Sequence, residues 1–192
     1  MIFPFDEVNK FKSRLSRYFT DADKDVPNSK KRIRSRQDCE DIIDELFDLY
    51  MMSLVNGVNS VNEQFNTVIE LPDDVVEDIV YKKIDGLTWV DRVWAWYEAG
   101  GDEPDINRIA ETEAHRIGNT AAFEVAKLAG AVNKTWICQL LPTSRDTHVY
   151  LDGVTVALND EFYTFMGNHA LFPGQFGVAE EDCGCLCEIK FS

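Results

Sequence analysis

Apolar residues recur at helical spacing through the first two thirds of the chain. In residues 5–19 they stand at positions 5, 8, 11, 15 and 18/19, which predicts an amphipathic helix with a basic outer face. From Asp38 they continue at 39, 42/43, 46, 50, 54, 58, 61 and 65, which predicts a long helix weakened at Gly57. The intervening residues 20–36 are polar and contain proline, asparagine and serine, so they predict a loop.

Three further segments extend the helical pattern. Residues 72–84 form a short amphipathic stretch with a proline in the expected first turn and acids near its start. Residues 87–97 place tryptophans and valine on one face, which favours a buried cluster over a ligand platform. A longer helix follows, with Asp102 as its N-cap and Gly130 at its end.

After Ala131 the pattern changes to alternation. Residues 134–141 are rich in β-branched and aromatic side chains and predict a strand. Residues 148–156 predict a short hairpin around Asp152-Gly153, and 183–191 predict the last strand. The expected fold class is therefore α+β, with an N-terminal helical region followed by a small β-containing module.

Composition limits the function classes. The 192 residues are 45% hydrophobic, enough for a folded core, and they suit one domain or a compact domain with a helical extension. The formal net charge of −15, from 34 acids and 19 bases, argues against non-specific nucleic-acid binding, although 10 of the 19 bases fall in the first 36 residues. That basic stretch is either a solvated linker or a contact for an acidic partner or nucleic acid.

The sequence shows no signal peptide, membrane span or disulfide framework. No stretch approaches the length of a membrane span, and the N-terminus lacks the features of a signal peptide, so we expect a protein made in the cytoplasm without membrane contact. Five cysteines without a secretory signal argue against a disulfide scaffold.

Three of the five cysteines lie close together near the C-terminus, at Cys183, Cys185 and Cys187. On a strand, alternate residues share one face, so the three thiols would point the same way. A zinc site built on them needs a further ligand, and His148 is the best candidate. The alternative is that these cysteines serve as small apolar core residues.

Other catalytic patterns are weak. Phosphate-binding glycine loops, dinucleotide fingerprints, zinc-protease motifs and nucleophile elbows do not occur in the sequence. A cysteine–histidine nucleophile has no orienting third group that the sequence marks. Glu113 and His115, two positions apart on a helix, point to different sides, and Glu113 is either a surface acid or a buried acceptor.

The order of motifs in residues 106–190 resembles the phage head morphogenesis family, the Mu F-like minor head proteins. Typical members have a Thr-Glu helix, a Lys-x-Trp strand, an Arg-x-x-His segment before Leu-x-Gly, a Pro-Gly loop and a terminal Asn-Cys-Arg-Cys. The matching residues include Thr112, Glu113, Asn119, Lys134, Trp136, Arg145, His148, Asp152, Gly153, Pro173, Cys183 and Cys185. Departures are Glu111, where the family usually has arginine, and Asp182 and Gly184 in the terminal motif.

The resemblance implies a virion component with no catalytic activity. The implied partners are the portal protein and, beyond it, major capsid or scaffold subunits. The implied location is the capsid interior or the portal vertex. The expected division is a basic helix and linker (1–36) that serves as a docking arm, a helical region (37–105) and the Mu F-like module (106–192). Competing readings are a small phage-borne effector enzyme or toxin, and a zinc-dependent binding module unrelated to phages.

The resemblance also bears on the zinc hypothesis. Some relatives carry Cys-x-x-Cys at the positions of Arg145 and His148, which with the terminal pair completes a four-cysteine site. Here only His148 could ligate, because arginine stays protonated, and Cys187 would have to substitute. Alternatively, Arg145 and His148 hydrogen-bond Glu113 or backbone groups and lock the helix to the sheet.

Overall fold

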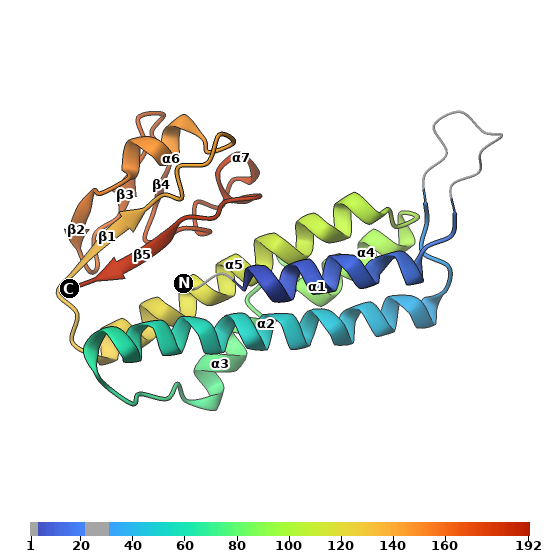
Figure 1. Ribbon diagram of the computed structural model, residues 1–192, viewed down its shortest axis with the longest axis horizontal. Helices are drawn as coiled ribbons and strands as arrows, with labels where there is room; N and C mark the ends of the chain where they lie inside the picture. The colour runs from blue at the N-terminus through green and yellow to red at the C-terminus, as the bar shows by residue number, and fades with distance from the viewer. Residues whose placement is uncertain (1–3, 22–30) are drawn as a thin grey trace.

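The computed structural model describes residues 4–21 and 31–192, and it has an elongated helical layer with a small β-containing module packed on one side (Figure 1). The helices are α1 (Phe5–Leu15), the short 3₁₀ helix η1 (Ser16–Tyr18), α2 (Arg36–Phe65), α3 (Asp73–Val80), α4 (Trp89–Glu98), α5 (Glu103–Leu128), α6 (Asp146–Leu151) and α7 (Ala179–Asp182). The strands are β1 (Asn133–Ile137), β2 (Thr155–Ala157), β3 (Phe162–Tyr163), β4 (His169–Ala170) and β5 (Glu188–Phe191). The predicted α+β class is confirmed.

Local sequence signals account for the helix starts. The Ser35 side chain accepts a hydrogen bond from the Asp38 backbone N–H at the start of α2. Thr88 and Asp91 form a reciprocal capping box at α4. Asp102 caps α5, as predicted. Of the predicted loop 20–36, residues 22–30 lie outside the described part of the chain.

Among the described elements, helices α2 and α5 share the most extensive contact. Their backbones approach closely at Gly57. A Cβ built on Gly57 would lie 2.2 Å from the Gly118 carbonyl oxygen and 3.2 Å from the Ala121 Cβ. The expectation that Gly57 weakens α2 is wrong: the helix runs through it unbroken, because the missing side chain lets the two backbones touch. Here the cost of a helical glycine is offset by close packing.

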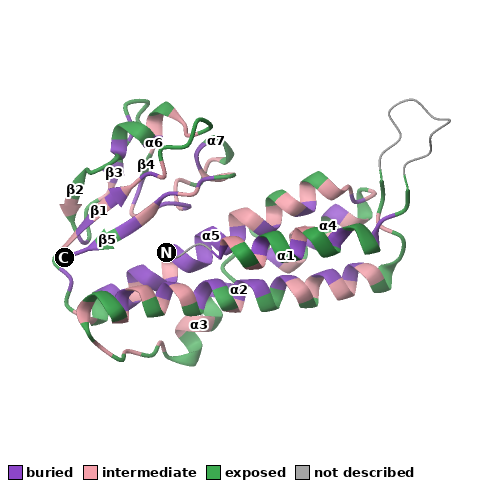
Figure 2. Cartoon of the chain, in the orientation of Figure 1, coloured by how far each residue is buried: buried purple, intermediate pink, exposed green. Residues whose placement is uncertain are grey.

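Helix α1 belongs to the helical core. Phe11 and Leu15 are fully buried against the other helices, and Figure 2 shows the buried residues on the faces that the helices turn toward one another. Its bases are engaged as well: Arg14 Nε donates to Glu45 at 2.9 Å, and Arg17 pairs with the same carboxylate. The first helix is therefore integrated into the bundle, and the role of residues 1–36 as a docking arm stays a prediction.

The β-module is built around one central strand. β1 pairs antiparallel with β2 on one side and β5 on the other, with Trp136 opposite Ile189, and β3 and β4 form a separate hairpin. The predicted hairpin over 148–156 is wrong. Its first half is the helix α6, and Gly153, at φ +76°, follows this helix and leads the chain into β2.

The last strand is shorter than predicted. Only Glu188–Phe191 is extended and paired; Cys183, Cys185 and Cys187 precede it in irregular backbone. Gly184, at φ +67°, bends the chain between the first two cysteines, which favours glycine. Strict alternation is lost there, and the three thiols do not share one face.

Candidate metal centre

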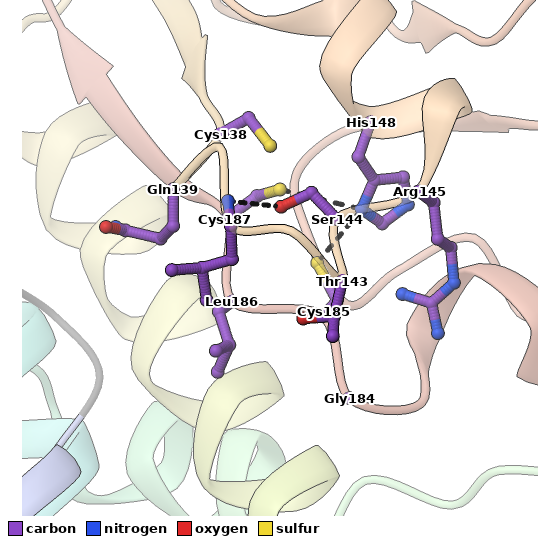
Figure 3. Close-up of a pocket in the computed structure, with 11 residues that line it drawn as sticks. Cys138, Gln139, Thr143, Ser144, Arg145, His148, Gly184, Cys185, Leu186 and Cys187 are labelled. Carbon is purple, nitrogen blue, oxygen red and sulfur yellow. Dashed lines mark hydrogen bonds between the residues drawn. The ribbon is translucent and has the colours of Figure 1, made fainter.

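His148, Cys185 and Cys187 converge inside the β-module. One turn of α6 directs His148 inward, and the segment before β5 brings the two cysteines to it (Figure 3). His148 Nδ1 lies 3.4 Å from Cys185 Sγ and 3.5 Å from Cys187 Sγ. The three ligand atoms all lie within 4.8 Å of one another, and all three residues are buried. This donor set, an imidazole and two thiols, is the one that zinc prefers.

A buried carboxylate holds the far side of the imidazole. Glu181 Oε2 lies 3.1 Å from His148 Nε2, while Thr147 and Asn168 donate to the same carboxylate at 2.8 and 2.9 Å. Burial opposes ionisation of Glu181, but these hydrogen bonds and the nearby His148 and Arg145 keep its pKa below the ordinary value. A carboxylate on the second nitrogen orients a histidine and leaves Nδ1 facing the thiols, which is the arrangement of many metal sites.

The Cys185 and Cys187 thiols interact with each other as well as with His148. A hydrogen bond with Cys185, followed by burial, raises the pKa of Cys187 well above that of a free thiol. The cavity that they line has a volume of about 30 Å³, room for one water-sized particle. A metal ion would exchange these protons for bonds to the sulfurs.

Cys183, the remaining member of the predicted ligand set, lies apart from this group. It is partly exposed, and its carbonyl oxygen accepts a hydrogen bond from the Arg145 guanidinium. The structure thus brings together three of the four predicted metal ligands. The predicted bond from Arg145 to a backbone group is present, whereas Glu113 is bonded by Arg92 and Arg116 instead.

Glu113 is a buried acceptor, which decides between the two alternatives left by the sequence. Arg92 Nη2 donates to it at 2.6 Å from α4, and Arg116 Nε donates at 2.9 Å from the next turn of α5. Arg116 also reaches the Ile79 carbonyl at 3.0 Å. The Thr-Glu motif therefore joins three helices, with Glu113 as the shared partner.

Two other α5 residues connect the helical layer to the candidate site. His115 Nε2 lies 2.6 Å from the Cys187 carbonyl oxygen, and Asn119 donates to the same oxygen at 3.4 Å. Burial lowers the pKa of His115 to about 4, so its imidazole is neutral at pH 7. Pro173 is buried beside this contact, and a Cβ on Gly174 would lie 3.2 Å from His115 Nδ1. As predicted, Glu113 and His115 serve different sides of the helix.

Aromatic rings and one hydrogen bond complete the surroundings. Trp136 is fully buried and stands edge-on to His148 at 5.6 Å between ring centroids, and Phe176 stacks on His148 at 5.5 Å. Asp152 Oδ1 accepts from the Cys138 backbone N–H at 2.9 Å. The partnership of Glu181 with His148 was not predicted from the sequence. Its signal there is the position of Glu181 two residues before Cys183.

A second, larger cavity lies between the α3–α4 connection, α4, α5 and residues 174–183. Its volume is about 360 Å³, and its polar lining includes Lys82, Lys83, Arg92 and Glu113. Charges of both signs face this space. It is large enough to receive a small polar ligand.

Two curated proteins are similar to the chain. An NAD(+)–arginine ADP-ribosyltransferase of Enterococcus faecalis is 32% identical over 147 residues, which is 72% of this chain and 30% of that protein. Minor head protein GP7 of Bacillus phage SPP1 is 31% identical over 85 residues, which is 43% of this chain and 28% of that protein. No family model and no solved structure matches.

The chain therefore spans less than a third of the length of either relative. The similarity to the phage protein supports a relationship with phage head proteins. The expectation of a protein without enzymatic activity is contradicted, because the longer similarity is to an ADP-ribosyltransferase. Within the described residues, none of the helices combines the length and apolarity that crossing a membrane requires.

Proposed function

We propose that the chain is a Mu F-like minor head module of a tailed phage or prophage that binds the portal protein during head assembly. The similarity to minor head protein GP7 is the observation that carries this proposal. The order of motifs from Thr112 to Cys185 supports it, and one motif residue, Asn119, donates from α5 to the Cys187 carbonyl of the β-module. In this role the protein would reside in the virion.

The β-module presents a surface suited to such binding. Tyr150 and Phe165 meet edge-to-face at 5.6 Å, and each is more than half exposed. Tyr163 and Met166 are exposed beside them, at 60% and 70%. We call these four residues the aromatic tip. Exposed clusters of aromatic side chains and methionine are typical of protein interfaces.

The acidic residues beside the aromatic tip indicate which kind of partner surface would complement it. Glu161 lies beside Tyr163, pairing with His169 at 3.0 Å, and Asp160 precedes it in the chain. An apolar patch with an acidic border fits an apolar hollow bordered by lysine or arginine. We assign this complementary surface to the portal protein, and capsid and scaffold subunits are the other outcomes of the test.

The test is a pull-down after co-expression with the portal protein of the same phage or prophage. The wild-type chain is expected to retain portal, and a Tyr150→Ser/Phe165→Ser variant is expected to lose it. Val68→Ser is the matched control, because Val68 is 93% exposed in the α2–α3 connection and lies outside the tip. Capture of portal by the double variant would reject the tip, and no capture by the wild type would reject portal as the partner.

A zinc ion at the candidate metal centre is part of the proposal. His148, Cys185 and Cys187 would hold it, and Glu181 would orient the imidazole. Such an ion would link α6 to the chain before β5 and stabilise the β-module. Elemental analysis of the purified protein is expected to find about one zinc per chain, and metal-free protein after expression with added zinc would refute it.

A second candidate follows from the other relative. The chain would then be one part of an ADP-ribosyltransferase that transfers ADP-ribose from NAD⁺ to arginine, as the name of the similar Enterococcus protein describes. The 360 Å³ cavity beside Glu113 is the place to look for NAD⁺ binding. Incubation of the full-length gene product with labelled NAD⁺ and an arginine-bearing acceptor tests it, and a lack of label transfer would count against it.

A further inference from the structure

Cys138 lines the cavity of the candidate metal centre, although it is 47 residues away in the chain from Cys185, the nearer of the two ligating cysteines. It follows β1 directly and is 6% exposed. It lines the same 30 Å³ cavity as His148, Cys185 and Cys187, and Figure 3 shows its sulfur on the Cys187 side of that cavity. Its sulfur lies outside the cluster of three ligand atoms that are all within 4.8 Å of one another, and it faces the same cavity.

Cys138 shares its cavity with the Cys187 thiol. Burial first, and then the nearby Cys187 thiol, raise the pKa of Cys138. The Cys138 backbone is also fixed, since its N–H donates to Asp152 Oδ1 at 2.9 Å. Rotation about its Cα–Cβ bond would carry its sulfur toward the three ligand atoms.

The three converging ligands leave one position of a tetrahedral ion open. Water, a residue of a partner or a further residue of this chain could fill that position, and the cavity that the ligands line is small, with a volume of about 30 Å³. The aromatic rings of Trp136 and Phe176 cover His148. Cys138 is the remaining sulfur, nitrogen or carboxylate ligand that lines this cavity.

We propose that Cys138 is the fourth ligand and that the centre is a closed Cys₃His zinc site. This inference rests on the zinc proposal above and adds the residue that closes the coordination sphere. Binding of Zn²⁺ forms three Zn–S bonds and one Zn–N bond, and the three thiols release three protons to solvent, so the bound unit carries one negative charge. With four protein ligands the ion has no open position, and its role is structural.

A closed site changes which parts of the fold the ion connects. Cys138 extends from the central strand β1, His148 from α6, and the cysteine pair from the segment before β5. A three-ligand ion would leave β1 out. With Cys138 bound, the ion joins all three segments around Trp136.

The first test counts sulfurs on the wild-type protein. X-ray absorption at the zinc edge is expected to show three sulfurs at about 2.3 Å and one nitrogen at about 2.0 Å. Two sulfurs with added nitrogen or oxygen would reject Cys138. This measurement needs no variant, so a destabilised mutant cannot obscure it.

The second test uses cobalt in place of zinc. Cys138→Ser is expected to lose about a third of the sulfur-to-cobalt absorption, one of three thiolates, and to bind zinc at least about 10-fold more weakly. Cys183→Ser is the matched control and is expected to match the wild type in both readouts. Unchanged absorption and affinity in Cys138→Ser would overturn the Cys138 assignment alone, whereas a wild type without bound metal would overturn the zinc proposal itself.

Discussion

The contact at Gly57 allows a prediction in which two physical effects have opposite signs. Replacing a helical glycine with alanine ordinarily stabilises a protein by about 1 kcal/mol, because alanine loses less backbone entropy on folding. At Gly57 the new methyl would lie 2.2 Å from the Gly118 carbonyl oxygen and 3.2 Å from the Ala121 methyl. Non-bonded carbon and oxygen atoms need about 3.2 Å or more, so α2 and α5 would have to separate by about 1 Å.

Overpacking of this kind costs about 1–3 kcal/mol, and more when two long helices must move as units. Contact with backbone, which cannot rotate away, places Gly57→Ala toward the upper end. After the gain in helix propensity is subtracted, we expect a net loss of about 2 kcal/mol, or about 4–8 °C in the melting temperature of a chain of this size. Urea unfolding monitored by circular dichroism measures the free energy of unfolding, and thermal unfolding monitored in the same way measures the melting temperature.

The matched control is Asn59→Ala, on an exposed position of the same helix. It is expected to leave stability unchanged or to raise it by up to about 0.7 kcal/mol. A Gly57→Ala protein as stable as the wild type, or more stable, would refute the close α2–α5 approach.

Two further predictions concern buried charges. Glu113→Gln leaves the Arg92 and Arg116 guanidinium groups without their anion, so we expect a loss of about 3 kcal/mol in the free energy of unfolding; an equally stable variant would show that this network is dispensable. Burial lowers the pKa of Lys134 from 10.5 to about 8, so the unfolded chain holds more protons between those values and stability should rise as the pH increases from 8 to 10.5. The difference between these two pKa values corresponds to about 3 kcal/mol, so Lys134→Met should reduce the rise by about that amount, and identical pH profiles for the two proteins would contradict the assignment.

The helical part of the fold was predictable because its signals are local. The apolar spacing of α2 and the cap at Asp102 each report a helix without reference to the rest of the chain. The predictions failed where contacts with residues distant in the sequence determine the local structure. Alternating residues from His148 suggested a strand, but burial of both His148 and Leu151 requires positions three apart on one helical turn. Gly184 likewise broke an alternation that looked continuous.

The candidate site was predicted in part for the same reason. His148, Cys185 and Cys187 were recognisable by residue type and by the spacing of the cysteines. Glu181 and Cys138 were not recognisable. Glu181 meets the histidine only through the α7 turn, and Cys138 lines the same cavity only because β1 pairs with β5. Residue type shows which side chains can ligate, and only the sheet register shows which of them meet.

The position of β1 at the centre of its sheet sets an order of events during synthesis. Its partner β5 leaves the ribosome about 50 residues later, and a contact as remote as Gln64 with Phe191 joins residues 127 positions apart. Helices α1 to α5 can therefore assemble while Trp136 still has only one neighbouring strand. In that interval the nascent module offers an unpaired strand edge to other chains and to proteases, and chaperone binding should be concentrated there.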